Sequence, residues 1–151
     1  MKSNVVTAAQ IAARVIRRGD LKSDAEAFVD VRLPGSTPKY NYQLIGGGVS
    51  QNPHSFVNLR EPHGFGLGGA SMPGGVTNNL HMHFTAEVFM CWAGQWRLRW
   101  GPSGEQGELV FGEGDIATIP PWIFRGFSNE GGDDGYLYTM LGRDATGGVV
   151  W

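Results

Sequence analysis

The stretch GVTNNLHMHFTAEVFMCWAG, from Gly75 to Gly94, decides the fold of this chain. It places His81 and His83 one residue apart, and on a β-strand such residues point to the same face. Glu87 follows a short interruption and opens a second strand-like run. Two neutral imidazoles and one carboxylate on one side form a facial set that binds a first-row divalent metal and leaves positions open. The stretch therefore predicts a metal site made by His81, His83 and Glu87.

The spacing of these residues also resembles the first of the two motifs of the cupin superfamily. It reads Gly75, five residues, His81-x-His83, three residues, Glu87, six residues and Gly94. The resemblance implies an all-β fold, a cupin-type double-stranded β-helix (a jelly-roll barrel), here with one short N-terminal helix.

A second motif of the family follows in GDIATIPPWIFRGFSN, from Gly114 to Asn129, and it is degenerate. Trp122 stands where the family usually has Gly. Arg125 stands where the family usually has its fourth metal-binding His. The resemblance to a cupin therefore covers roughly Gly75 to Asn129, and the second motif changes what the first one implies about the metal.

The pattern of the rest of the chain fits such a barrel. Thr7 to Arg18 has helical periodicity with Thr7 as the cap, and no helical segment of useful length appears after residue 20. Short strand-like runs separated by Gly-rich turns follow instead. The expected strands are Ala27–Leu33, Tyr40–Ile45, Ser55–Leu59, Leu80–Phe84, Glu87–Trp92, Gln95–Trp100, Glu108–Phe111, Asp115–Ile119, Ile123–Ser128 and Tyr136–Leu141.

This pattern divides the chain into an N-terminal helix and extension, residues 1–35, and a barrel domain, residues 36–151. The chain ends in GGVVW, an apolar run without a polar tail. We expect this run to pair with a partner subunit, or the barrel to be the first domain of a longer protein.

Composition limits the classes of partner and compartment. The formal net charge of −2 gives no reason to expect nucleic acid or an anionic membrane as a partner. The 24 glycines among 151 residues indicate many turns. The single cysteine, Cys91, excludes an internal disulfide, and it is expected to be a small buried hydrophobe. With no signal-peptide pattern and no apolar run of the ~18 residues that span a membrane, a cytoplasmic protein is expected.

Arg125 is the residue on which the mechanism depends, and three interpretations compete. It clamps a substrate carboxylate, phosphate or enolate with its guanidinium fork. Alternatively, it pairs with Glu87 and takes that carboxylate away from the metal, or the strand register is shifted and Arg125 points outward. The first interpretation is favoured, because a buried cation beside a metal ion needs an anion between them.

Further residues are candidates for the walls and mouth of the pocket. Phe89, Trp122, Phe127 and Tyr138 are predicted to bind substrate with Arg125, although plain core packing explains most such residues. His54 and His63 are expected at the surface, where either could supply a fourth metal ligand. The segment HGFGLGG, residues 63–69, fits GxGxxG but lacks the helix of a dinucleotide site, and it is predicted to be a mobile loop over the barrel mouth.

Two classes of function follow. The first is a metal-dependent enzyme acting on a small anionic or oxygen-rich compound, with Fe favoured and Zn, Mn or Ni as alternatives. Resemblance to cupins implies dioxygenases of diketones, flavonoids or aromatic acids, and the same site also suits isomerase or lyase chemistry. The second class is a non-catalytic binding or regulatory barrel, supported by the missing fourth ligand. A metal-free epimerase-like cupin is a third possibility. The resemblance also implies a homodimer.

Overall fold

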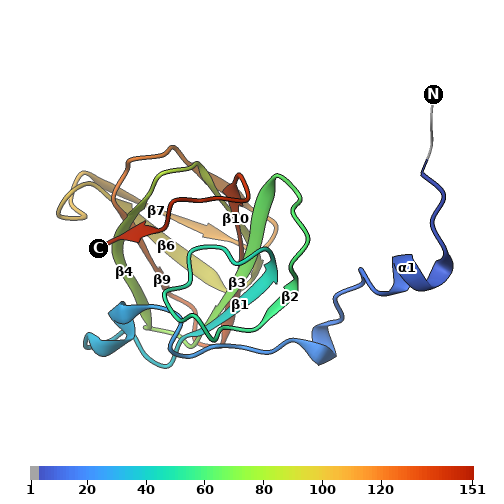
Figure 1. Cartoon of the computed structure of the whole chain (residues 1–151). Coiled ribbons are helices and arrows are strands. Elements are labelled where there is room, and N and C mark those ends of the chain that lie inside the picture. The colour runs from blue at the N-terminus through green and yellow to red at the C-terminus, as the bar shows by residue number, and fades with distance from the viewer. Residues whose placement is uncertain (1–3) are drawn as a thin grey trace.

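The computed structural model describes residues 4–151, which form a barrel with an N-terminal arm that extends away from it (Figure 1). The arm carries the helix α1 (Ala8–Ala12), capped by Thr7 and Gln10, and none of its residues is buried. Two 3₁₀ turns follow, at Arg18–Asp20 and Val29–Arg32. The strands are β1 (Tyr40–Ile45), β2 (Val57–Leu59), β3 (Phe65–Met72), β4 (Thr77–His83), β5 (Glu87–Ala93), β6 (Gln95–Trp100), β7 (Gly107–Gly112), β8 (Ile116–Ile119), β9 (Arg125–Asn129), β10 (Gly135–Gly142) and β11 (Val149–Val150).

The strands form two sheets that face each other. One sheet has the order β2-β1-β3-β10-β5-β8 and the other β11-β4-β9-β6-β7. All neighbours are antiparallel except β1 and β2. Two sheets with non-sequential neighbours are the arrangement of a jelly roll, and they confirm the predicted all-β double-stranded β-helix.

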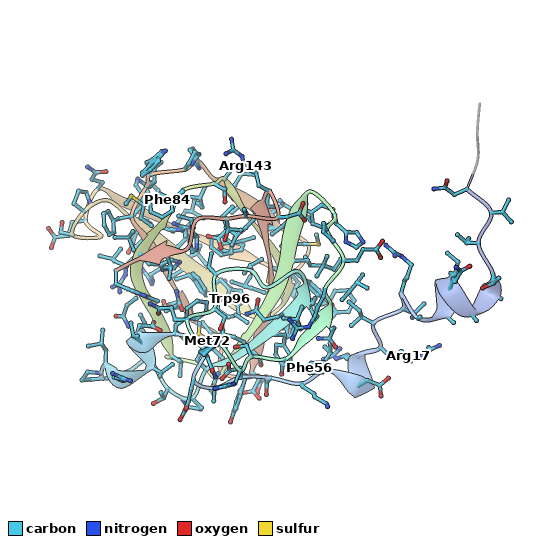
Figure 2. All side chains as sticks on the ribbon, in the orientation of Figure 1. Arg17, Phe56, Met72, Phe84, Trp96 and Arg143 are labelled. Atoms are coloured by element: carbon cyan, nitrogen blue, oxygen red, sulfur yellow. The ribbon has the colours of Figure 1, made fainter. Side chains whose placement is uncertain are left out.

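Apolar side chains from both sheets fill one end of the space between them. Trp96, Phe89, Leu137 and Met72 are fully buried there, and Figure 2 shows Trp96 and Met72 within the barrel. Polar side chains of the inner faces, among them Asn41, Gln43 and Asn78, lie in the other part, around His81. This division leaves one part of the barrel as core and the other as a pocket.

Three expectations from the sequence are corrected. The helix ends at Ala12 rather than Arg18. Residues 29–32, inside a predicted strand, form a 3₁₀ turn, and Asp30 of this turn is buried in an ion pair with Lys39. The Gly-rich segment predicted to be a loop over the mouth is part of strand β3. In addition, the C-terminal run pairs with β4 of its own chain.

Within residues 4–151, no helix has the length and apolar character needed to cross a membrane.

Candidate metal centre

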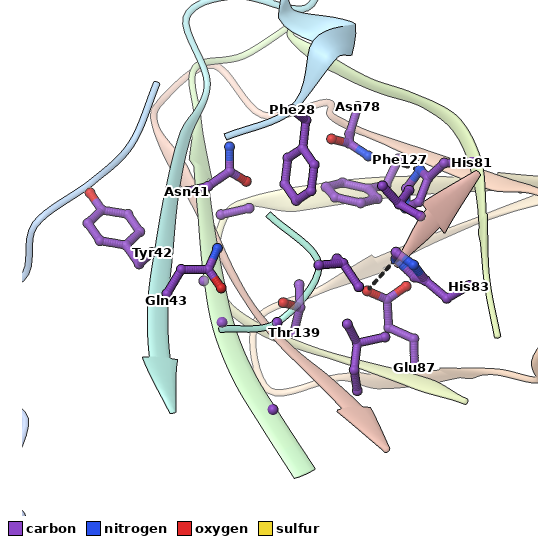
Figure 3. A pocket seen from close by; sticks show the side chains of 18 of the residues that line it. Phe28, Asn41, Tyr42, Gln43, Asn78, His81, His83, Glu87, Phe127 and Thr139 are labelled. Carbon is purple, nitrogen blue, oxygen red and sulfur yellow. Dashed lines mark hydrogen bonds and ion pairs between the residues drawn. The ribbon is translucent and has the colours of Figure 1, made fainter. Parts of the chain in front are cut away.

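Strands β4 and β5 bring His81, His83 and Glu87 together inside the barrel. Both histidines face inward, as their spacing predicts, and all three residues are at most 4% exposed. One ligand atom from each lies within 4.8 Å of the others, and Nε2 of His83 is 3.8 Å from Oε1 of Glu87. Figure 3 shows the imidazole of His83 directed at the Glu87 carboxylate, with His81 beside it. The three donors are close enough to hold one ion.

Hydrogen bonds to backbone carbonyls fix the metal-binding form of both imidazoles. Nδ1 of His81 lies 2.7 Å from the carbonyl oxygen of Asn79, and Nδ1 of His83 lies 3.2 Å from that of Gly148. A carbonyl only accepts, so each Nδ1 carries the proton and donates it. Nε2 of each ring then has a free lone pair, which is the usual arrangement for histidines that bind metal.

The protonation state agrees with this arrangement. Burial lowers the pKa of His81 well below its ordinary 6.5, and the nearby positive charge of Arg125 lowers it further. Burial also lowers the pKa of His83, against the opposing effect of the Glu87 carboxylate. Both rings are therefore neutral near pH 7, and only a neutral imidazole can bind a metal. Two neutral nitrogens and one carboxylate suit a divalent first-row metal.

Arg125 reaches the site from β9, where it is the register partner of His81. Its Nε and Nη2 donate to Oε2 of Glu87 at 3.0 and 2.5 Å, and Nη1 donates to the carbonyl of His81 at 3.3 Å. The side chain is 1% exposed. This geometry fits the pairing interpretation better than the favoured substrate clamp, because most of the donors are already used. The pairing occupies Oε2 and leaves Oε1 turned toward His83, so it does not remove the carboxylate from the metal site.

A second buried ion pair supports the other side of the site. Nζ of Lys39 donates to both oxygens of Asp30, at 2.6 and 2.7 Å, and to Oδ1 of Asn78 at 2.6 Å. The amide nitrogen of Asn78 lies 3.1 Å from Nδ1 of His81 and packs against the ring without a hydrogen bond, because Nδ1 directs its own proton to the carbonyl of Asn79. Burial lowers the pKa of Lys39, and the hydrogen bonds that it donates to Asp30 oppose this effect. The pair thus fixes Asn78 against the first histidine.

A pocket opens beside the triad, and only one of the four predicted aromatic residues lines it. The cavity is narrow, with a volume of about 50 Å³, and Phe127 forms part of the wall. Phe89 belongs to the fully buried core instead. Trp122 is 63% exposed and packs edge-on against Phe84, and Tyr138 contacts Trp92 on the outer face of its sheet. The placement of Trp122 and Tyr138 in the pocket is therefore corrected.

The remaining candidates lie away from the metal site. His54 is exposed, and Nε2 of His63 is 3.0 Å from a guanidinium nitrogen of Arg14, so neither joins the triad. Cys91 is buried in the core, as expected, and burial raises the pKa of its thiol.

Several residues that build the pocket were not predicted from the sequence. The C-terminal segment covers the mouth, because β11 pairs with β4 and the ring of Trp151 lies 5.1 Å from that of His81. On the opposite wall, β1 contributes the amides of Asn41 and Gln43. Asn41 and Gln43 are two positions apart on a predicted strand, so their side chains share one face. Two amides on a face that points into the barrel were the signal in the sequence that could have indicated this polar wall.

No protein-family model matches the sequence, and no curated protein matches it. Solved structures match the fold. The polyketide cyclase RemF from Streptomyces resistomycificus aligns over 90% of this chain and 82% of its own, with a TM-score of 0.64 and 18% identity. A cupin superfamily protein from Desulfitobacterium hafniense DCB-2 aligns over 72% and 81%, with a TM-score of 0.53 and 8% identity.

An oxalate oxidase aligns over 58% of this chain, with a TM-score of 0.52 and 20% identity, and the match spans about half of the oxidase, 46% of its length. Identities at this level are evidence of fold and not of activity. The fold confirms the resemblance drawn from the first motif. With its two sheets, its paired histidines on β4 and its glutamate on β5, the chain has a cupin-type fold.

Proposed function

We propose that this protein is a metal-dependent enzyme of the dioxygenase type that acts on a small anionic or oxygen-rich organic compound. The observation that carries the proposal is the state of the two imidazoles, each tied through Nδ1 to a carbonyl with Nε2 free beside Glu87. A divalent metal, iron in the first place, would supply oxygen activation and a Lewis acid for a bound oxygen atom.

The lining of the pocket supports a reaction centred on the metal. Among the described residues that line it, the only histidine, lysine, arginine, cysteine or acidic side chains are His81, His83 and Glu87. Once these residues bind a metal, the wall offers no separate general base. This favours metal-centred chemistry over the epimerase-like alternative, which needs a free histidine.

The charges around the site support an anionic substrate. The histidines are neutral, and the charges of Glu87 and Arg125 offset each other in a contact that excludes water. A divalent ion would therefore add positive charge that the protein leaves uncompensated. Buried charge of one sign is unfavourable unless an opposite charge joins it, so an anionic group of the substrate is the natural partner.

Lyase, isomerase or cyclase chemistry is the second candidate. The neighbouring structures include an oxidase and a cyclase, so the fold does not choose between redox and non-redox reactions. The identity of the metal separates the two candidates, since zinc does not take part in redox chemistry.

Elemental analysis of the purified protein tests the proposal. We expect about one equivalent of iron, manganese, nickel or zinc in the wild type and its loss in His81→Ala and Glu87→Ala. His54→Ala removes an exposed histidine and serves as the control, with the metal retained. Oxygen uptake with aromatic hydroxy acids and 1,3-diketones then tests the reaction type. A metal-free wild type, with both variants as stable as the parent, would contradict the proposal.

A further inference from the structure

Two amide side chains on β1 face the pocket across from the metal ligands. Asn41 and Gln43 are 6% and 7% exposed, and Figure 3 shows both on the pocket side of the strand, with Tyr42 on the other side. Thr139 of β10 adds a hydroxyl to the same wall. The pocket therefore has two polar ends, one made by the triad and the other by β1 and β10.

The amide nitrogen of Asn41 has no hydrogen-bond partner among residues 4–151. A buried donor without a partner is costly, and native proteins keep few of them. A packing role does not explain an amide here, because leucine has nearly the same shape without the unpaired donor. The Nδ2 group instead fits a site that an acceptor from outside the chain completes.

Aromatic rings line the space between the two polar ends. Phe127 lies edge-on to His81, with 6.3 Å between ring centroids, and Trp151 packs 5.9 Å from Phe28. The indole of Trp151 is held by a hydrogen bond of 3.0 Å to Oε1 of Gln51. Rigid aromatic walls favour a flat apolar body, and a few placed polar groups at the ends fix its orientation.

We propose that Asn41 and Gln43 form a subsite for a second oxygen function of the substrate. The ligand is a small aromatic compound with one oxygen pair toward His81, His83 and Glu87, and a hydroxyl or carbonyl oxygen at the far end that accepts from Asn41. This inference rests on the proposed function, since it names the class of compound that the metal site takes.

Zinc-loaded protein and three related probes test the subsite. Salicylate carries only the chelating end, whereas 4-hydroxysalicylate and 5-hydroxysalicylate add a distal hydroxyl. Calorimetric titration should show that at least one hydroxylated probe binds the wild type about 10-fold more tightly than salicylate, which is about 1.4 kcal/mol. Asn41→Leu and Gln43→Leu should remove this preference while salicylate binds within about 2-fold of the wild type.

Gln95→Leu is the matched control, because it makes the same change at an exposed amide of β6 outside the pocket. It should keep the full preference. Thermal unfolding of the metal-free variants gives an independent readout, since Asn41→Leu removes an unpaired donor and should leave the melting temperature unchanged or raised.

Three results would overturn the subsite. These are a wild type that binds all three probes equally, leucine variants that keep the preference, and leucine variants that lose zinc. The last result would mean that the two amides help to hold the metal instead of the substrate. Zinc is measured in every sample, so a wild type that fails to hold zinc is recognised as a failure of the proposed function instead. Titration of the metal-free proteins with the same probes still decides the subsite in that case.

Discussion

Replacing Arg125 by methionine measures how much the guanidinium contributes to the stability of the site. Methionine keeps much of the volume but leaves the Glu87 carboxylate, 4% exposed, without its partner. Removing one member of a buried pair costs about 3–5 kcal/mol. For a domain of this size, ~2–4 °C per kcal/mol gives a fall of about 6–20 °C in melting temperature for the metal-free protein.

Metal should reduce this loss, because an ion beside Oε1 gives the carboxylate a second positive partner. Urea unfolding of wild type and Arg125→Met, each with zinc and with a chelator, measures the four stabilities. Arg97→Met is the control: Arg97 pairs with Glu108 and Glu130 on the surface, and its loss should move the midpoint little. Equal losses with and without zinc, or no loss in either, would refute the idea that Arg125 holds Glu87 for the metal.

Three further predictions concern other parts of the molecule. Trp122 has φ 68°, so Trp122→Gly should be more stable than Trp122→Ala by about 1 kcal/mol in urea unfolding, since both lose the ring but only alanine keeps the strain. Lys39→Met should cost about 3–5 kcal/mol by the same assay, and adding Asp30→Leu should recover most of it. Exposed Met90, Trp92 and Ile116 on the outer sheet face are proposed to join two copies, so light scattering should detect a dimer that Trp92→Lys weakens.

Elements whose burial alternates were predictable from the sequence. Tyr40–Ile45 and Gln95–Trp100 were predicted with the observed bounds, because period-two alternation records which face meets the core. The inward placement of His81 and His83 was predictable for the same reason. The helix was predicted to be too long because Ile11 and Val15 form an apolar stripe, yet this stripe is not buried, and both side chains are about half exposed. Helical periodicity without a packing partner does not hold a helix.

Contacts between distant segments could not be predicted. Glycines at 68 and 69 suggested a loop, yet they lie in β3, where a Cβ on Gly69 would come within 2.1 Å of the hydroxyl of Tyr136. Only the fold reveals that this strand needs glycine for close packing. The ion pair of Lys39 with Asp30 was hidden in the same way, since two charged residues nine positions apart carry no mark of burial.

The substitution of Arg125 for a fourth histidine changes the chemistry that the site can support. A histidine there would add a neutral donor and fill a coordination position, whereas the arginine fills none and draws on the charge of Glu87 through Oε2. A carboxylate that shares its charge with a guanidinium would give less charge to a metal at Oε1, and a bound metal would then keep more of its own positive charge. A metal with only three protein ligands would have room for two oxygen atoms of a substrate. Because its positive charge would be less neutralised by Glu87, at least one of these oxygens is expected to be anionic. This agrees with a pocket whose far wall ends in an amide donor that the chain itself does not satisfy.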